Sequence, residues 1–147
     1  MAHSKAKNWI HLVFCTKNRE HFITPKAEPK IHQYLRDELR NMKCPVDSLN
    51  GMSEHIHILF LLHPQKSLSQ VVRQLKGGSS HAINYSNLLP CKFAWSLGYA
   101  AYSVSESGVS AVRRYIQNQK EHHRKRSFIR EYQEFLSLHG FDDDKNG

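Results

Sequence analysis

The segment "GMSEHIHILFLLHP", residues 51–64, decides the expected fold because its side chains alternate with the period of a β-strand. One face of this strand is purely apolar and consists of Ile56, Ile58, Phe60 and Leu62. The opposite face begins with two imidazoles, those of His55 and His57, followed by Leu59 and Leu61. The segment therefore predicts a core strand that holds two histidines side by side on its second face.

Patterns on both sides of this strand predict further strands and helices. In chain order these are a strand at 8–16, a helix at 26–42, a hairpin strand before the turn-prone "NGMSE", a helix capped by Ser67, and a strand at 92–104. Gly77 and Gly78 are expected to interrupt or end the second helix, and Gly98 to mark a bulge or a close backbone approach. The order β-α-β-β-α-β predicts an α+β, ferredoxin-like fold, an antiparallel sheet with helices on one face.

The C-terminal part of the chain predicts a connector and two more helices. Residues 103–110 are polar and indicate a flexible connector. A helix follows at about 109–123, and a last helix at about 127–139 lies between the caps Ser127 and Gly140. With a core at about 8–104, the 147 residues are expected to form a single domain, 1–147.

Basic residues outnumber acidic ones, 21 to 13, which gives a formal net charge of +8. This surplus favours a polyanionic partner such as nucleic acid. No apolar run approaches the roughly 20 residues of a membrane-spanning helix, and the start of the sequence lacks the layout of a signal peptide. The three cysteines are far apart and indicate neither a disulfide framework nor a thiolate zinc site. We therefore expect a cytoplasmic protein with no membrane partner.

The histidine pair at 55 and 57 suggests a metal site, but its spacing alone is a weak signal. Two histidines two residues apart on a strand can point at one ion, and a third ligand must come from elsewhere. A chain with 11 histidines in 147 residues contains about one such pair by chance. Ordinary sheet residues whose rings are satisfied by neighbours would have the same spacing. Spacing leaves both interpretations open.

The segment "RRYIQNQ", residues 113–119, places Tyr115 and Gln119 four residues apart. On a helix this spacing puts a hydroxyl and an amide on the same face, one turn apart. A nucleophile and a metal ligand could thus be delivered together. The alternative is a core tyrosine beside a solvated glutamine, and the spacing does not exclude it.

Four segments together carry a more specific signal. In order they are "EHIHILFLLHP", "SLSQVVRQLKGGSS", "FAWSLGYAAYSVSES" and "AVRRYIQNQKEHHRKRSFIREYQEFLSLHG". They resemble the small single-tyrosine transposases of bacterial insertion sequences, whose domain is of the HUH (histidine-hydrophobic-histidine) type. The resemblance covers roughly residues 8–141. It implies that His55 and His57 are the HUH metal ligands, that Gln119 is the third ligand, and that Tyr115 is the nucleophile.

This resemblance implies a defined chemistry. Two imidazoles and one amide are neutral ligands that leave a divalent ion its full charge, so we expect one exchangeable Mg²⁺ or Mn²⁺ per site. Attack by the tyrosine on a DNA phosphate would give a 5′-phosphotyrosine and a free 3′-hydroxyl, which can later rejoin DNA ends. The implied function is that of a DNA transposase acting by transesterification.

The resemblance also implies the partners. These are single-stranded DNA with hairpins at the ends of the element, and a second copy of the chain in a homodimer whose active sites can be composite. Aromatic candidates for base stacking are Trp95, Tyr99 and Tyr102. Basic candidates for phosphate contacts are Arg73, Lys76, Arg113, Arg114, Lys120, Arg124, Lys125 and Arg126.

Three other functions stay open at this point. A domesticated relative would cleave palindromic repeats with the same active residues. A non-catalytic RNA-binding domain could share the ferredoxin-like sheet, although the RNP1 pattern is absent. A metal-dependent nuclease would release hydrolysed ends without a covalent protein–DNA bond.

Overall fold

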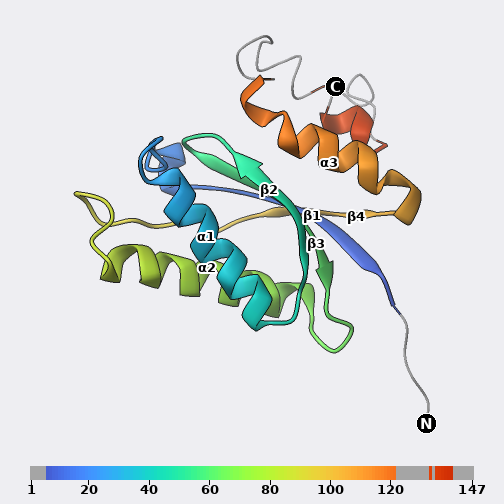
Figure 1. The fold of residues 1–147 in the computed structure, drawn as a ribbon, viewed down its shortest axis with the longest axis horizontal. Coiled ribbons are helices and arrows are strands. Elements are labelled where there is room, and N and C mark those ends of the chain that lie inside the picture. The colour runs from blue at the N-terminus through green and yellow to red at the C-terminus, as the bar shows by residue number, and fades with distance from the viewer. Residues whose placement is uncertain (1–5, 122–132, 134, 141–147) are drawn as a thin grey trace.

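Four strands form one antiparallel sheet in the computed structural model, which describes residues 6–121, 133 and 135–140. The strands are β1 (Asn8–Cys15), β2 (Val46–Gly51), β3 (His55–Leu62) and β4 (Ala100–Val104). Their order across the sheet is β2-β3-β1-β4 (Figure 1). The histidine strand therefore lies inside the sheet, hydrogen-bonded to β2 on one side and β1 on the other.

The helices divide between the two faces of this sheet (Figure 1). α1 (Glu28–Asn41) and α2 (Leu68–Tyr85) pack together on one face, and α3 (Val109–Gln117) covers the other. Two 3₁₀ turns, η1 (Lys17–Arg19) and η2 (Glu106–Gly108), complete the described elements. The predicted ferredoxin-like α+β fold is confirmed, with α3 added on the second face.

The alternation of the strands produces two separate apolar clusters. Beneath α1 and α2 lies the main core, to which the sheet contributes Ile10, Leu12, Phe14, Ile56, Ile58 and Phe60. A smaller cluster lies beneath α3 and consists of Leu59, Val109, Val112, Tyr115 and Ile116. Burial of such side chains contributes about 1.5–3 kcal/mol each, so both clusters hold helices on the sheet. The polar side chains of the histidine strand lie next to the smaller cluster.

α2 runs through Gly77 and Gly78 without interruption, so the predicted break is wrong. Glycine costs about 1 kcal/mol in a helix, but apolar residues on both sides of the pair are buried and keep the helix intact. A Cβ on Gly78 would overlap the Glu38 carboxylate of α1. This glycine therefore lets the two helices approach each other closely.

The predicted strand at 92–104 is shorter than expected, since only β4 is extended sheet. The preceding residues form a loop in which Trp95 makes a single bridge to Thr16. The Trp95 indole is buried and donates a hydrogen bond to Ser79 Oγ at 2.9 Å. Apolar burial has overridden the strand pattern here, and Trp95 is not exposed for base stacking. Gly98 was expected to mark a bulge or a close backbone approach, and the open space around it contradicts the second of these.

The connector predicted at 103–110 is mostly regular structure. β4 continues to Val104, η2 follows, and α3 begins directly after η2. The Trp9 indole donates to Glu106 Oε1 at 3.2 Å, and Lys7 lies 3.2 Å from the same oxygen. These contacts fasten the turn between β4 and α3 to the first strand.

The last predicted helix, about 127–139, falls partly outside the described residues. Residues 135–138 are helical, and Gly140 follows with φ +79°, as expected for a glycine that ends a helix.

Cys15, Cys44 and Cys91 are free thiols, as expected. None of the helices in the described part is long and apolar enough to cross a membrane.

Candidate active site

Three imidazoles gather on the sheet face that α3 covers. The antiparallel register sets His55 opposite Cys15 and His57 opposite Val13, so His11, two residues before Val13, lies diagonal to His57. The three rings are buried, with exposed fractions of 7% for His55, 4% for His57 and 0% for His11. The predicted pair is thus part of a larger histidine cluster.

α3 carries Tyr115 to this cluster. The helix is amphipathic, and its apolar side packs on Leu59 of the histidine strand. The Tyr115 ring is 7% exposed, and its centroid lies 5.5 Å from that of His57 and 6.2 Å from that of His11. The predicted nucleophile and the predicted metal ligands therefore lie side by side.

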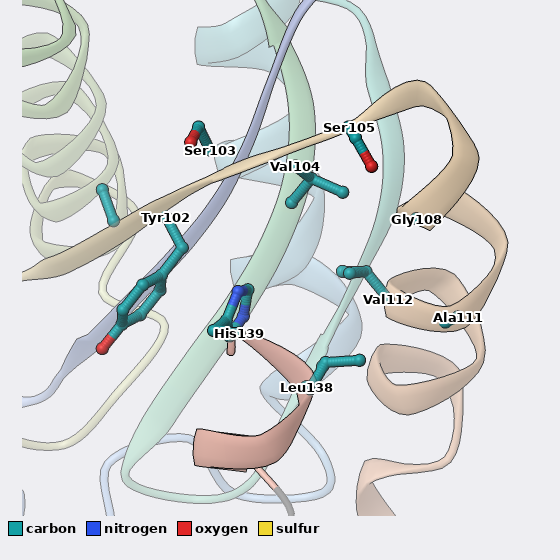
Figure 2. Close-up of a pocket in the computed structure, with 10 residues that line it drawn as sticks. Tyr102, Ser103, Val104, Ser105, Gly108, Ala111, Val112, Leu138 and His139 are labelled. Carbon is teal, nitrogen blue, oxygen red and sulfur yellow. The ribbon is translucent and has the colours of Figure 1, made fainter. Parts of the chain in front are cut away.

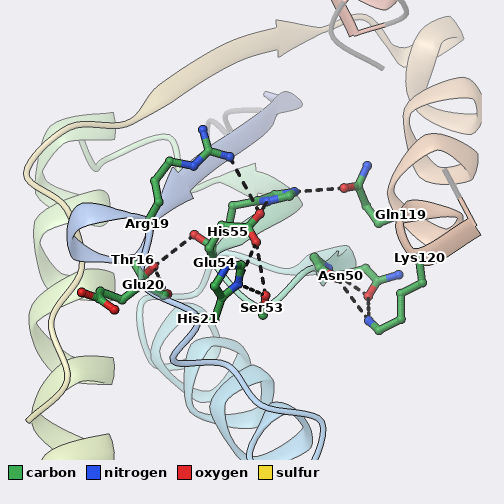
Figure 3. A network of polar contacts seen from close by, with 11 residues as sticks. Thr16, Arg19, Glu20, His21, Asn50, Ser53, Glu54, His55, Gln119 and Lys120 are labelled. Atoms are coloured by element: carbon green, nitrogen blue, oxygen red, sulfur yellow. Dashed lines mark hydrogen bonds and ion pairs between the residues drawn. The ribbon is translucent and has the colours of Figure 1, made fainter. Parts of the chain in front are cut away.

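Gln119 reaches the cluster from the turn after α3. The helix ends at Gln117, Asn118 leaves the helical conformation, and residues 119–121 form a new helical turn. The single continuous helix predicted at about 109–123 is therefore broken at Asn118, and residues 122 and 123 lie outside the described part. The Gln119 side chain is nevertheless fully buried, and its Oε1 lies 3.1 Å from His55 Nε2 (Figure 3).

Glu54 fixes the other nitrogen of His55. Its Oε1 lies 2.5 Å from His55 Nδ1 (Figure 3), and this hydrogen bond lowers the pKa of the Glu54 carboxyl to about 2 although burial opposes the shift. Arg19 and His21 lie within 3.8 Å and 3.5 Å of the same carboxylate. A carboxylate only accepts, so His55 Nδ1 carries the proton and Nε2 is the nitrogen directed toward Gln119.

The residues around His55 fit a divalent cation. Gln119 presents its amide oxygen to His55 Nε2 at 3.1 Å, a contact that a proton on Nε2, a 180° rotation of the amide or a cation shared by the two side chains would each satisfy. Gln119 Nε2 is buried and has no hydrogen-bond partner in the described part of the chain. Within the same residues, no group of three His, Cys, Asp or Glu side chains is placed to hold a metal ion. Imidazole nitrogen and amide oxygen are both ligands of divalent metal ions, and as neutral groups they would leave the charge of such an ion intact.

His11 lies between the site and the C-terminal turn, which consists of the helical residues 135–138 and the turn at 139–140. Its Nε2 lies 3.0 Å from His57 Nδ1, and its Nδ1 lies 2.6 Å from His139 Nε2. Burial, reinforced by the neighbouring His139, lowers the pKa of His11 to about 3, and burial lowers that of His139 to about 4. Both rings are therefore neutral at pH 7.

The polar side of α3 is fastened to its own sheet. Arg113 makes two hydrogen bonds to Asp47, at 2.9 and 2.7 Å, and the pKa of the Asp47 carboxyl falls because the guanidinium donates to it. Lys120 Nζ lies 2.9 Å from Glu28 Oε2. It also lies 3.0 Å from Asn50 Oδ1, as Figure 3 shows. These contacts hold the residues on either side of Tyr115 and Gln119.

The basic residues predicted to contact phosphates lie in different settings. Arg113 and Lys120 make the contacts just described, and Lys76 donates to the carbonyls of Ser96 and Gly98. Arg73 and Arg114 are exposed. Arg124, Lys125 and Arg126 lie outside the described residues. Their binding to DNA stays a prediction.

Sequence reasoning missed Glu54, His11, Phe135 and His139. Alternation along residues 8–16 separates His11 from the apolar row, and this is a signal that could have marked it. Glu54 directly precedes the histidine pair. The contacts of Phe135 and His139 depend on where the chain returns in space, and no local pattern indicates that.

Comparisons with known proteins find similar sequences and structures. The sequence model of the family described as "Transposase IS200 like" matches residues 4–119. The ISDra2 transposase TnpA of Deinococcus radiodurans is 26% identical over 116 residues, which cover 76% of this chain and 83% of that protein.

Two solved structures share the fold. A candidate transposase from Deinococcus radiodurans has a TM-score of 0.64 and 24% identity, with 81% of this chain and 98% of that chain covered. A REP-associated tyrosine transposase bound to a REP hairpin has a TM-score of 0.59 and 15% identity, with 84% and 74% covered.

Proposed function

Because the chain belongs to the IS200-like transposase family, we propose that it cleaves and rejoins single-stranded DNA through a covalent bond to Tyr115. Membership of this family makes it a transposase, a protein of DNA transposition. The observation that carries the finer proposal is the convergence of Tyr115, His55, His57 and Gln119 on one face of the sheet.

The proposed step exchanges one phosphoester for another. The Tyr115 phenol oxygen attacks the phosphorus, the bond from phosphorus to the 3′ oxygen breaks, and a 5′-phosphotyrosine forms. The proton lost by the phenol balances the one gained by the leaving 3′-hydroxyl. A 3′-hydroxyl that attacks the phosphotyrosine reverses the exchange, so DNA ends are joined without ATP.

His55, His57 and Gln119 would hold a divalent cation beside the phosphate. Such an ion supplies Lewis-acid stabilisation of the charge that develops on the phosphate oxygens. The chain itself contributes placement, because α3 and the following turn bring the phenol and the Gln119 amide to the same histidine pair. The side chains of this cluster are mostly buried, which would limit the water that can compete with the tyrosine for the phosphate.

The proposed substrate is single-stranded DNA with hairpins at the ends of the element. The net charge of +8 supports binding of a polyanion. One structural relative, a REP-associated tyrosine transposase, is bound to a REP hairpin. Arg73 and Arg114 are exposed and form no ion pair within the described part of the chain, so their guanidinium groups are suited to meet phosphates.

A non-catalytic RNA-binding domain fits these contacts less well. Such domains use an open sheet face on which bases stack against aromatic residues. Here α3 covers that face, and Trp95 is buried in the core on the other side. The arrangement therefore supports catalysis over recognition by the sheet.

The proposal is tested with a panel of labelled single-stranded oligonucleotides that form hairpins, taken from the DNA on either side of the gene. In Mn²⁺ we expect a protein–DNA adduct that survives denaturation, and little reaction with the same sequence as a duplex. Cleavage without an adduct would mean hydrolysis, and binding without cleavage would mean a recognition module. Either result would contradict the proposed chemistry.

Attack within one chain is the expected arrangement, because Gln119 lies against His55 of the same chain and α3 is fastened to its own sheet. The homodimer stays a prediction, and each subunit would then hold its own site. Mixing Tyr115→Phe chains with His57→Ala chains should give no adduct. Recovery of the adduct in the mixture would show that the tyrosine of one subunit meets the histidines of the other.

A further inference from the structure

Three imidazoles form an unbroken chain from the proposed metal site to the C-terminal turn. His57 Nδ1 lies 3.0 Å from His11 Nε2, and His11 Nδ1 lies 2.6 Å from His139 Nε2. His57 lies in β3, His11 in β1 and His139 in the C-terminal turn, so neighbouring rings are 46 and 128 residues apart in the sequence. Contacts of this kind are held only by the tertiary fold.

Aromatic rings enclose this chain. The Phe135 ring lies with its centroid 5.6 Å from that of His11, 6.0 Å from that of His57 and 6.0 Å from that of Tyr115. Tyr102 stacks on His139 at 4.2 Å with an interplanar angle of 21°. Figure 2 shows these last two side chains close together beside a cavity of about 440 Å³ between β4, the start of α3 and the last turn. The three imidazoles are thus confined in position.

Hydrogen bonding between neutral imidazoles has a direction. Each neutral ring has one N–H donor and one lone-pair nitrogen, so each contact in the chain needs one of each. If Nε2 of His57 is the metal-binding atom, its Nδ1 carries the proton and donates to His11 Nε2. His11 then carries its proton on Nδ1 and donates to His139 Nε2. One tautomer of each ring satisfies both contacts, and in this set the proton of His57 is on Nδ1 and not on Nε2.

We infer that His11 is a positioning residue that, held by His139, fixes the ring and the tautomer of His57 so that His57 Nε2 faces the metal. Glu54 has the same role at His55, because its carboxylate binds His55 Nδ1 and so fixes the orientation and the tautomer of that ring. The inference rests on the proposed function in one respect, that His57 is a metal ligand. It adds a residue of the first strand to the residues on which that site depends.

Single substitutions of His11 or His139 test this inference. His11→Phe keeps a ring of similar size but removes both hydrogen bonds, and His11→Gln retains an amide that can accept from His57 and donate to His139. His139→Phe removes only the far contact. His63→Phe is the control, because His63 lies just after β3 and accepts a local bond from the backbone of Gln65.

The first readout uses neither metal nor DNA. Nitrogen-15 chemical shifts of histidine-labelled protein report which ring nitrogen of His57 carries the proton. We expect Nδ1–H in the wild type, the control and His11→Gln, and a mixture of tautomers in His11→Phe, with a smaller change in His139→Phe. Wild-type protein with His57 protonated at Nε2 overturns the inference, and so does an unchanged His57 in folded His11→Phe.

The second readout is the affinity of the protein for Mn²⁺ alone. His11→Phe should weaken Mn²⁺ binding about 10-fold or more, as is typical when a residue that hydrogen-bonds to a metal ligand is replaced. His11→Gln should lose less affinity, and the control should lose none. Equal affinity in wild type and His11→Phe would overturn the inference. Failure of the wild type to form the DNA adduct would instead count against the proposed function, and the tautomer of His57 would still decide the role of His11. If His11→Phe does not fold, His11→Gln, His139→Phe and the wild-type tautomer decide it.

Discussion

Tyr115→Phe is expected to abolish the covalent protein–DNA adduct and to reduce strand cleavage by about a thousandfold or more, equal to about 4 kcal/mol of transition-state stabilisation. The substitution removes the hydroxyl alone. The remaining ring still fills the space between Leu59 and Phe135, so the packing of α3 is retained. Denaturing gels of the labelled oligonucleotide with each protein measure both effects.

Two tyrosines provide controls for this experiment. Tyr102→Phe changes a tyrosine on the same sheet face that stacks on His139, and it should leave the adduct intact. Tyr132 lies in the predicted last helix, outside the described residues, and Tyr132→Phe should also retain the adduct. An adduct that persists in Tyr115→Phe and disappears in Tyr132→Phe would place the nucleophile in the last helix.

His55→Ala and His57→Ala are each expected to lower metal-dependent cleavage by about 100-fold or more. Each removes one of the imidazoles that would hold the cation, and at His55 the substitution also leaves the buried Glu54 carboxylate without its principal hydrogen-bond donor. The measurement is the cleavage rate as a function of Mn²⁺ concentration. His63→Ala, just after the same strand, is the matched control and should cleave at the wild-type rate.

DNA affinity separates loss of chemistry from loss of the fold in these variants. Both should bind the single-stranded oligonucleotide about as tightly as the wild type, since the charge of the protein surface is unchanged. Wild-type cleavage by His57→Ala at limiting Mn²⁺ would contradict the assignment of that imidazole to the metal site.

Much of the fold follows from local patterns in the sequence. The period of two in residues 51–64 and the helical spacing of 26–42 give the correct elements, because each element has one face in an apolar core. Residues 92–99 have strand-like composition, yet Trp95 packs in the core as part of a loop. Tertiary burial outweighs strand propensity there.

The grouping of the candidate site residues could be predicted from the sequence only in part. Short spacings indicated His55 with His57 and Tyr115 with Gln119, and the resemblance to a family joined the two pairs. His11 and His139 could not be joined to them, because their contacts depend on strand register and on the return of a distant segment. Alternation in β1 could have put His11 on the face opposite Ile10, Leu12 and Phe14, but it could not have put His11 beside His57.

The most direct test of the central claim is the identification of the residue that becomes linked to DNA. Wild-type protein is trapped on a labelled single strand in Mn²⁺, digested with a protease and a nuclease, and analysed by mass spectrometry. We expect a phosphate-linked nucleotide on Tyr115, attached through the 5′ phosphate, together with a free 3′-hydroxyl on the released strand. A nucleotide linked to another residue, or two hydrolysed ends with unmodified Tyr115, would contradict the claim.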